Sequence, residues 1–289
     1  MSETIAQAII NGVLIGGFYA LIGMGQNMIF GVMKIINFCQ GDLLMLGMYL
    51  TYALNVGLGL DPYVSFPIVA IVMFGIGALI QNGLITPSLK SGSSSNLLFL
   101  TVGLSMLLQN FALIFFKSDY HSIQTSYSTK TIDFFGQTVS FPKLISLGAL
   151  LIISATLFVI LKYTKLGRQI RATSQNAVGA QVTGIKTKWI YAATYGIGAA
   201  IAGIAGSLLM TFLYVFPTVG ATYGTKGYIV VVLGGLGSVP GAFFAGIGLG
   251  LLETVGSLLV GPSFKDSVVF FSFIVILVVR QYIVKFREG

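Results

Sequence analysis

Eight apolar runs dominate the sequence and leave little material for a water-soluble domain. They cover residues 5–32, 42–60, 64–86, 96–116, 144–162, 190–215, 226–260 and 266–284. A transmembrane α-helix needs about 20 predominantly apolar residues, and most of the runs reach that length. Only 8% of the residues are charged, whereas a soluble domain carries about 25%. The sequence therefore predicts an all-α, polytopic transmembrane bundle with about eight spans.

The run 226–260 is too long for one span and short for two. It contains LGGLGSVPG, residues 233–241, where glycine and proline are expected to break a helix. This predicts at least one broken or re-entrant segment. Whether the run crosses the membrane once, doubles back or re-enters stays open. The side of the C-terminus depends on the answer, because a single crossing leaves the basic residues of the tail outside.

Small residues recur four positions apart in several of the apolar runs. The pairs are Gly12/Gly16, Ala199/Gly203, Ala202/Gly206 and Gly246/Gly250. Such spacing places both members on one helix face, where a neighbouring membrane helix can approach closely. The pairs predict a closely packed bundle and indicate nothing about function.

A polar, basic segment, 162–188, interrupts the apolar runs. It holds six of the 16 Lys and Arg residues and no carboxylate. Basic connections between spans lie on the cytoplasmic side, which places the N-terminus and the polar connection 117–143 outside. Within the segment we expect a short, weakly amphipathic helix that ends near Gly184. The residues alone leave two interpretations open: a loop that only sets orientation, or a contact for a soluble partner.

A second polar interruption lies at the start of the run 42–60. Asp42 either caps the following helix or, with Asn37 and Gln40, belongs to a broken helix that lines a solute path. Interrupted apolar segments in both halves of a transporter indicate a central solute route, and the glycine-rich 233–241 is the second one here. Other polar residues in or beside the spans are interpreted as forming hydrogen bonds between helices. A role in the solute path is left open for Asn27.

The sequence lacks the residues that several classes of protein function need. No GxxxxGK[ST] motif is present, so ATP binding through a P-loop is not expected in this chain. Cys39 is the single cysteine, and His121, interpreted as a solvated loop residue, is the single histidine, so neither a disulfide nor a metal cluster is expected. We predict no enzyme, no catalytic residue and no metal site. The net charge of +8 is attributed to membrane topology and not to a nucleic-acid partner.

Three segments, in this order, resemble the signatures of one transporter family. They are INFCQGDLLMLGMYL (36–50), GRQIRATSQNAVGAQVTGI (167–185) and KGYIVVVLGGLGSVPGAFFAGIGLGLLE (226–253). They are similar to segments of the permeases of branched-chain amino acid ABC importers (LivH-type). The resemblance implies one transmembrane permease domain over residues 1–289 in the bacterial cytoplasmic (inner) membrane. It also implies that 162–188 is the cytoplasmic coupling segment.

The same resemblance implies the partners and the transport reaction. Branched-chain or related amino acids would be delivered by a periplasmic solute-binding protein. They would cross beside a second homologous permease subunit, identical or not. Two cytoplasmic ABC ATPase subunits would bind ATP and Mg, so this chain needs no cofactor of its own; membrane lipid surrounds it and no nucleic acid is involved. The alternative is an ion-coupled secondary transporter or channel, which the scarcity of carboxylates within the spans disfavours.

Two sets of site residues follow from the resemblance and from the interruptions. The residues expected to couple to the ATPase are Gly167, Arg168, Ile170, Arg171, Asn176, Ala177, Ala180, Gly184 and Ile185. The candidates for the substrate pathway are Asn27, Asn37, Gln40, Asp42, Gly234, Gly235 and Gly237. Val178 occupies a position that is often acidic in the family. A salt bridge to the ATPase is therefore not expected there, while docking of a helix in a groove remains the expectation.

Overall fold

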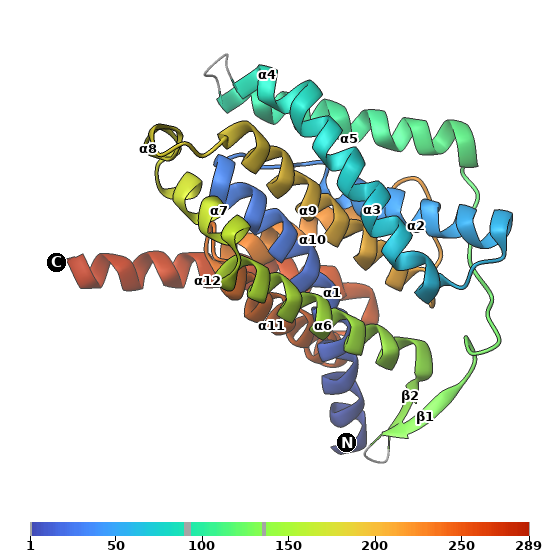
Figure 1. Cartoon of the computed structure of the whole chain (residues 1–289). Coiled ribbons are helices and arrows are strands. Elements are labelled where there is room, and N and C mark those ends of the chain that lie inside the picture. The colour runs from blue at the N-terminus through green and yellow to red at the C-terminus, as the bar shows by residue number, and fades with distance from the viewer. Residues whose placement is uncertain (1, 90–93, 135–136, 289) are drawn as a thin grey trace.

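A computed structural model describes residues 2–89, 94–134 and 137–288, and it consists of packed helices with one small hairpin (Figure 1). The predicted all-α membrane fold is confirmed. The first helices are α1 (Ser2–Met33), α2 (Gln40–Leu58), α3 (Pro62–Ile80), which continues through the π-helical turn Gln81–Ile85 into α4 (Thr86–Leu89), and α5 (Ser94–Phe116). The antiparallel strands β1 (Thr131–Phe134) and β2 (Gln137–Ser140) follow. The remaining helices are α6 (Phe141–Tyr163), α7 (Lys165–Gln175), α8 (Ala177–Val182), α9 (Thr187–Leu209), α10 (Val219–Gly234), α11 (Val239–Val260) and, after a 3₁₀ turn, α12 (Lys265–Glu288).

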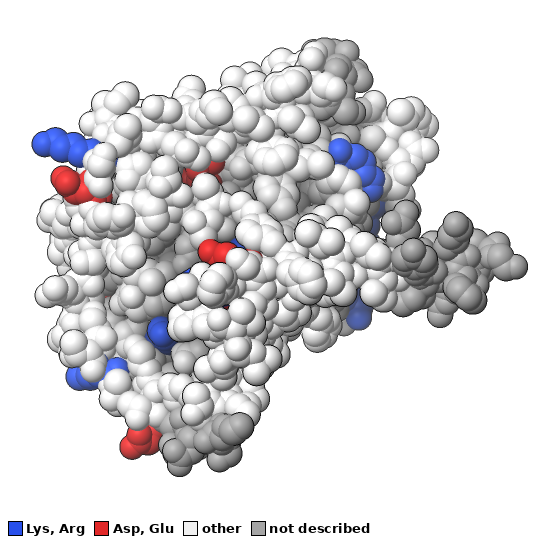
Figure 2. Space-filling model, turned by 180° about the vertical axis from the view of Figure 1, so that it is seen from behind, with Lys and Arg blue, Asp and Glu red and all other residues white. Residues whose placement is uncertain are grey.

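Within the described residues, seven helical segments are long and apolar enough to cross a membrane. They include α1, α6 and α9, whereas α2 and the 16-residue α10 are not among them. The face in Figure 2 is correspondingly almost free of charge, with a few isolated basic and acidic groups. The chain is a multi-pass membrane protein, and the predicted number of spans is approximately right.

The run 226–260 doubles back and does not form one span. α10 ends at Gly234 and α11 begins at Val239, with Gly235 (φ 88°) and Gly237 (φ 86°) in conformations that only glycine adopts easily. Compared with a single crossing of 226–260, the additional helix α10 reverses the direction in which α11 and α12 run through the bundle. α12 therefore runs toward the end of the bundle that carries α8 (Figure 1). This is the end at which the charge rule expects a basic tail, although the side chains of residues 280–288 lie outside the description.

The N-terminus and the basic segment lie at opposite ends of the bundle, as the charge pattern predicted. The N-terminus lies beside the β-hairpin, where Gln7 Nε2 donates to the carbonyl of Thr138 at 3.1 Å, while α7 and α8 lie at the opposite end (Figure 1). The sequence also predicts that the short connections at Lys34 and Lys90 lie on the inner side; Lys90 lies outside the described residues. We call the end with the N-terminus and the hairpin the outer end, and the end with α7 and α8 the inner end.

The described residues 117–134 of the outer connection contact the helices. Asp61 Oδ1 accepts from the backbone N–H of Tyr63 at the start of α3, and Asp61 Oδ2 accepts from the hydroxyl of Tyr127 at 2.6 Å. Burial, aided by this hydrogen bond, raises the pKa of the Tyr127 hydroxyl. His121 lies in the loop, as interpreted, but it is half-buried and not fully solvated. Its backbone pairs with Val215, and its ring centroid lies 4.6 Å from that of Tyr52.

Glycines of the predicted small-residue pairs lie at close helix contacts. A Cβ atom added at Gly250 of α11 would overlap the backbone of Gly12 and Gly16 on α1. On α9, Gly206 lies against the carbonyl of Leu44 in α2, and Gly203 lies against Met73 in α3. Because lipid supplies no hydrophobic force between helices, such close backbone approach is a main source of association in a membrane.

We predict that Gly250→Val destabilises the protein by about 2 kcal/mol, since overpacking a tight contact costs about 1–3 kcal/mol. The matched control is Gly248→Val on the same helix, where an added Cβ has no heavy atom within 4 Å. The measurement is the thermal unfolding midpoint in detergent. Equal midpoints for the two variants would show that the α1–α11 contact is not tight.

Candidate functional site

The inner basic segment begins with α7, which folds back onto the end of α6. The side-chain oxygen of Thr164 accepts from the N–H of Gly167 at 3.1 Å and caps the helix. Gly167 lies so close to the carbonyls of Ile160 and Leu161 that a side chain there has no room. The buried face of α7 consists of Gly167, Ile170 and Thr173, so α7 is an amphipathic helix held against the bundle.

The expectation of one short helix is corrected by the structure, because the segment contains two. Asn176 adopts an extended conformation (φ −152°, ψ 103°) between α7 and α8, and its Oδ1 accepts from the N–H of Gly179 at 2.8 Å. An asparagine cap of this kind starts a new helix and thereby ends the preceding one. Gly184 follows α8 with φ 85°, as expected for the residue that terminates this segment.

The predicted coupling residues come together on these two helices but differ in exposure. Gly167, Ile170 and Ala180 are buried, Ala177 and Ile185 are half-buried, and Arg168, Arg171, Asn176 and Gly184 are exposed. Arg171 donates to the carbonyls of Leu161 and Lys162 and so ties α7 to the end of α6. On α8, Val178 and Val182 are 71% and 85% exposed, which leaves two apolar side chains at the tip of a basic segment.

The break between α10 and α11 is held by Asn27 of α1. Its Nδ2 donates to the carbonyls of Gly235 (2.9 Å) and Ser238 (2.7 Å), and its Oδ1 accepts from the N–H of Gly237 (2.5 Å). One fully buried side chain therefore satisfies three backbone groups that the helix break leaves free. Of the pathway candidates, Asn27, Gly235 and Gly237 are brought together, and Gly234 packs directly on Gly241.

The link between α1 and α2, residues 34–39, is a non-helical segment in which buried and exposed residues alternate. Asn37 and Gln40 are fully buried, and Asn37 Nδ2 donates to Gln40 Oε1 at 3.0 Å. Gln40 Nε2 in turn donates to the carbonyl of Gly198, while Asn37 Oδ1 accepts from the hydroxyl of Tyr195 at 3.1 Å. These side chains bond to α9 and to each other, so they shape the interior of the bundle.

Asp42 is not the cap of α2. Cys39 occupies the cap position, and Asp42 lies within the first turn, where its Oδ1 accepts from Gln109 Nε2 of α5 at 2.9 Å. The interpretation as an N-cap is therefore corrected, although a carboxylate in the first turn still suits the helix dipole. Beside it, the backbone of Gly41 touches Gly220 of α10, so α2, α5 and α10 meet at Asp42.

Sequence reasoning missed a polar strip on α10. Thr218 precedes the helix, Thr222 and Thr225 lie on it, and all three are exposed. We call these three residues the threonine face. Their spacing of four and three puts them on one side of the helix, opposite the side on which Gly220 and Gly224 pack against Gly41 of α2. The signal was available as TxxxTxxT, but it reads equally well as ordinary polar residues near a span boundary.

Sequence reasoning also missed the role of Lys226, which lies buried in the middle of α10. Its Nζ donates to Glu253 Oε1 (2.8 Å) and to the Tyr19 hydroxyl (2.9 Å) and forms an ion pair with Asp266 (3.1 Å). Lys265 Nζ lies 3.9 Å from Glu253 Oε1, so two cations face two anions. The cluster joins α1, α10, α11 and the start of α12 without leaving net charge in the bundle.

Comparison with known proteins assigns the family. The family model described as branched-chain amino acid transport system / permease component matches residues 8–279. The chain belongs to this family. The BraD permease protein of the high-affinity branched-chain amino acid transport system of Pseudomonas aeruginosa is 32% identical, over 95% of this chain and 93% of its own.

Two further relatives of this family member are the LivH permease proteins of Salmonella typhimurium and Escherichia coli K12. Each is 30% identical, with 94% of this chain and 92% of the relative covered. No solved structure gives a significant match. The match to the family includes α7, α8, the helix break and the Lys226 cluster, so these features lie within its shared domain. The described residues hold no group of three or more His, Cys, Asp and Glu able to bind a metal.

We predict that Lys226→Met destabilises this permease by about 3 kcal/mol, because it leaves a buried carboxylate without its main partner. The double variant Lys226→Met/Glu253→Gln removes both buried charges and is expected to recover a large part of the loss, since Asp266 can reach solvent. The measurement is the unfolding midpoint of all three variants, including Glu253→Gln alone. Strictly additive losses would contradict a direct Lys226–Glu253 interaction.

Proposed function

We propose that the chain is the membrane-spanning permease subunit of an ATP-driven importer of branched-chain or related amino acids in the bacterial inner membrane. The observation that carries the proposal is the basic α7–α8 segment, which lies opposite the N-terminal end in a member of this permease family. A periplasmic solute-binding protein delivers the amino acid. Two cytoplasmic ABC ATPase subunits bind ATP and Mg, and a second permease subunit completes the complex.

The α8 tip is the proposed docking element for the ATPase. Exposed Val178 and Val182 enter an apolar groove of the ATPase, and the basic residues of α7 surround this contact. The valine in place of an acidic residue makes the contact apolar instead of ionic. ATP binding then shifts the permease between outward- and inward-open states only as far as the docking energy differs between them.

The proposed solute route follows the threonine face of α10. The second permease subunit covers this face, so the amino acid passes between two protein surfaces. Hydroxyl groups offer repeated, weak hydrogen bonds, which suits a path from which the solute must also leave. The other candidates support the wall of the route by holding the two non-helical segments in place: buried Asn27, Asn37 and Gln40, half-buried Gly234 and Gly235, and exposed Gly237.

An ion-coupled secondary transporter receives less support. The fully buried carboxylates among the described residues are Asp42 and Glu253. Asp42 accepts from Gln109, and Glu253 is paired with Lys226. Neither is a free acid of the kind that proton or sodium coupling requires in a membrane.

We predict that Val182→Asp reduces the amount of ATPase that co-purifies with the permease at least fivefold, since it places a charge in an apolar contact. The matched control is Val56→Asp, a valine 66% exposed at the outer end of α2. The measurement is the ratio of ATPase to permease after the permease is purified together with the ATPase that is encoded beside it. If both variants keep the wild-type ratio, docking through α8 is wrong.

A second prediction concerns the threonine face. Thr222→Val/Thr225→Val keeps the side-chain shape but removes two hydroxyls, and we expect about a tenfold lower kcat/KM for uptake by the reconstituted complex. Thr156→Val, on an exposed part of α6 away from this face, is the control. An equal effect of both substitutions on uptake would contradict the proposed route. The ATPase-to-permease ratio of the preceding prediction does not depend on this outcome.

A further inference from the structure

A pocket of about 310 Å³ lies where the inner ends of four helices meet. α1, α6 and α7 form three of its sides, and the break and first turn of α11 form the fourth. It is lined by Met28, Gly31, Val32, Phe158, Leu161, Lys162, Ile170, Arg171, Ser174, Gly237, Ser238, Val239 and Pro240. It is separate from the threonine face, to which it contributes no residue.

The lining is divided between an apolar floor and a cationic rim. Met28, Val32 and Phe158 belong to the floor, and Lys162 and Arg171 supply two positive charges. The Lys162 ammonium lies 5.4 Å from the centroid of the Phe158 ring, so cation and floor are in contact. No carboxylate lines the pocket. A ligand that suits it is an amphiphile with a negatively charged head and a hydrocarbon tail.

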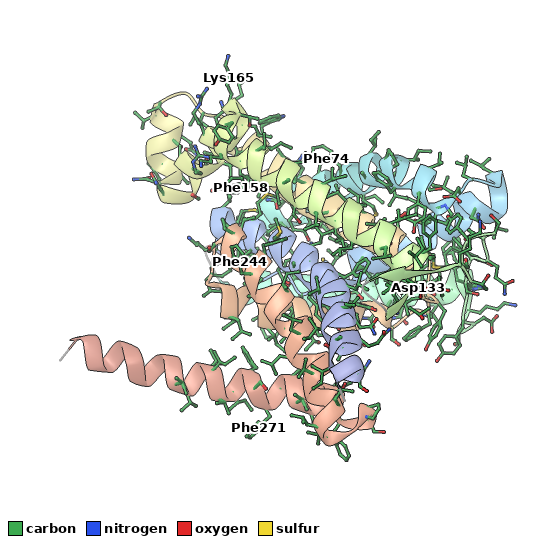
Figure 3. All side chains as sticks on the ribbon, turned by 90° about the horizontal axis from the view of Figure 1, so that it is seen from below. Phe74, Asp133, Phe158, Lys165, Phe244 and Phe271 are labelled. Atoms are coloured by element: carbon green, nitrogen blue, oxygen red, sulfur yellow. The ribbon has the colours of Figure 1, made fainter. Side chains whose placement is uncertain are left out.

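The position of the pocket selects the kind of amphiphile. Phe158 belongs to the last two turns of a membrane-crossing helix, and Lys162 follows it at the end of that helix. The rim therefore lies at the depth of lipid headgroups, and the floor lies at the depth of the acyl chains. In Figure 3, Phe158 lies on the α1 side of α6, while Lys165 projects away from the bundle.

We propose that this pocket binds an anionic phospholipid of the inner leaflet. Its phosphate lies at Lys162 and Arg171, and part of one acyl chain covers Met28, Val32 and Phe158. Free phosphate leaves the apolar floor uncovered, and a zwitterionic lipid gains less from two cations that have no carboxylate beside them.

The location gives such a lipid a role in coupling, an inference that rests on the proposed function. Ile170, Arg171 and Ser174 are on α7, whereas Gly237 and Ser238 belong to the break that Asn27 holds. A bound lipid therefore touches both the segment proposed to receive the ATPase and the break proposed to shape the solute route. Occupancy is expected to tighten the link between the two, and so to raise the number of amino acids imported per ATP.

The test measures lipid retention first, because that readout needs no transport. The full complex is placed in nanodiscs of equal phosphatidylglycerol and phosphatidylcholine, purified in detergent, and its retained lipids are counted by mass spectrometry. We expect phosphatidylglycerol to be retained preferentially. Lys162→Gln should lower its retention about fivefold. Lys165→Gln, an exposed lysine three residues away that does not line the pocket, should leave retention unchanged.

Three outcomes overturn the proposal. Equal loss in Lys162→Gln and Lys165→Gln means diffuse attraction to a basic surface. Equal retention of both lipids means an apolar site without headgroup recognition, and displacement by inorganic phosphate alone means a free-anion site. If retention behaves as expected but uptake does not depend on ATP, the lipid site stands and the proposed function fails.

Discussion

Every backbone N–H and C=O group inside a membrane needs a partner within the protein, and this constraint explains the most unusual part of the bundle. The chain leaves helical conformation at residues 34–39 and 235–238, and each break lies beside a buried amide side chain. Asn27 provides three hydrogen bonds at the second site, and Asn37 and Gln40 bond to α9 and to each other at the first. Without Asn27, the break at residues 235–238 would leave three backbone groups without these partners, at a cost of several kcal/mol each.

The buried charges, like the buried backbone groups, have partners within the protein. Lys226 is buried in α10 and is acceptable there because Glu253 and Asp266 neutralise it, while the Tyr19 hydroxyl accepts a hydrogen bond from it. The helices that it joins are also the ones whose backbones touch, as at Gly12 and Gly250. α1, α10 and α11 consequently form one closely packed group. α7 and α8 extend beyond it at the inner end, where only part of their surface is buried.

The sequence predicts the fold class well because hydrophobic length is a local property. It also locates the basic segment, the terminating Gly184 and the helix break at residues 233–241. It cannot count the crossings within 226–260, since the reversal depends on Gly235 and Gly237 being held by Asn27, more than 200 positions away. The partners of Lys226, the true bond of Asp42 and the threonine face are long-range features as well. Each residue by itself has a bland explanation, and only tertiary packing places it.

The α7–α8 segment can contact a cytoplasmic ATPase only if it lies on the cytoplasmic side of the membrane. Cys39 is buried, so single cysteines at Val182 of α8 and at Thr131 of β1 can be labelled with a membrane-impermeant maleimide. We expect Thr131→Cys to react in right-side-out vesicles and Val182→Cys to react only in inside-out vesicles. Labelling of Val182→Cys in intact right-side-out vesicles would place the basic segment outside and contradict its contact with a cytoplasmic ATPase.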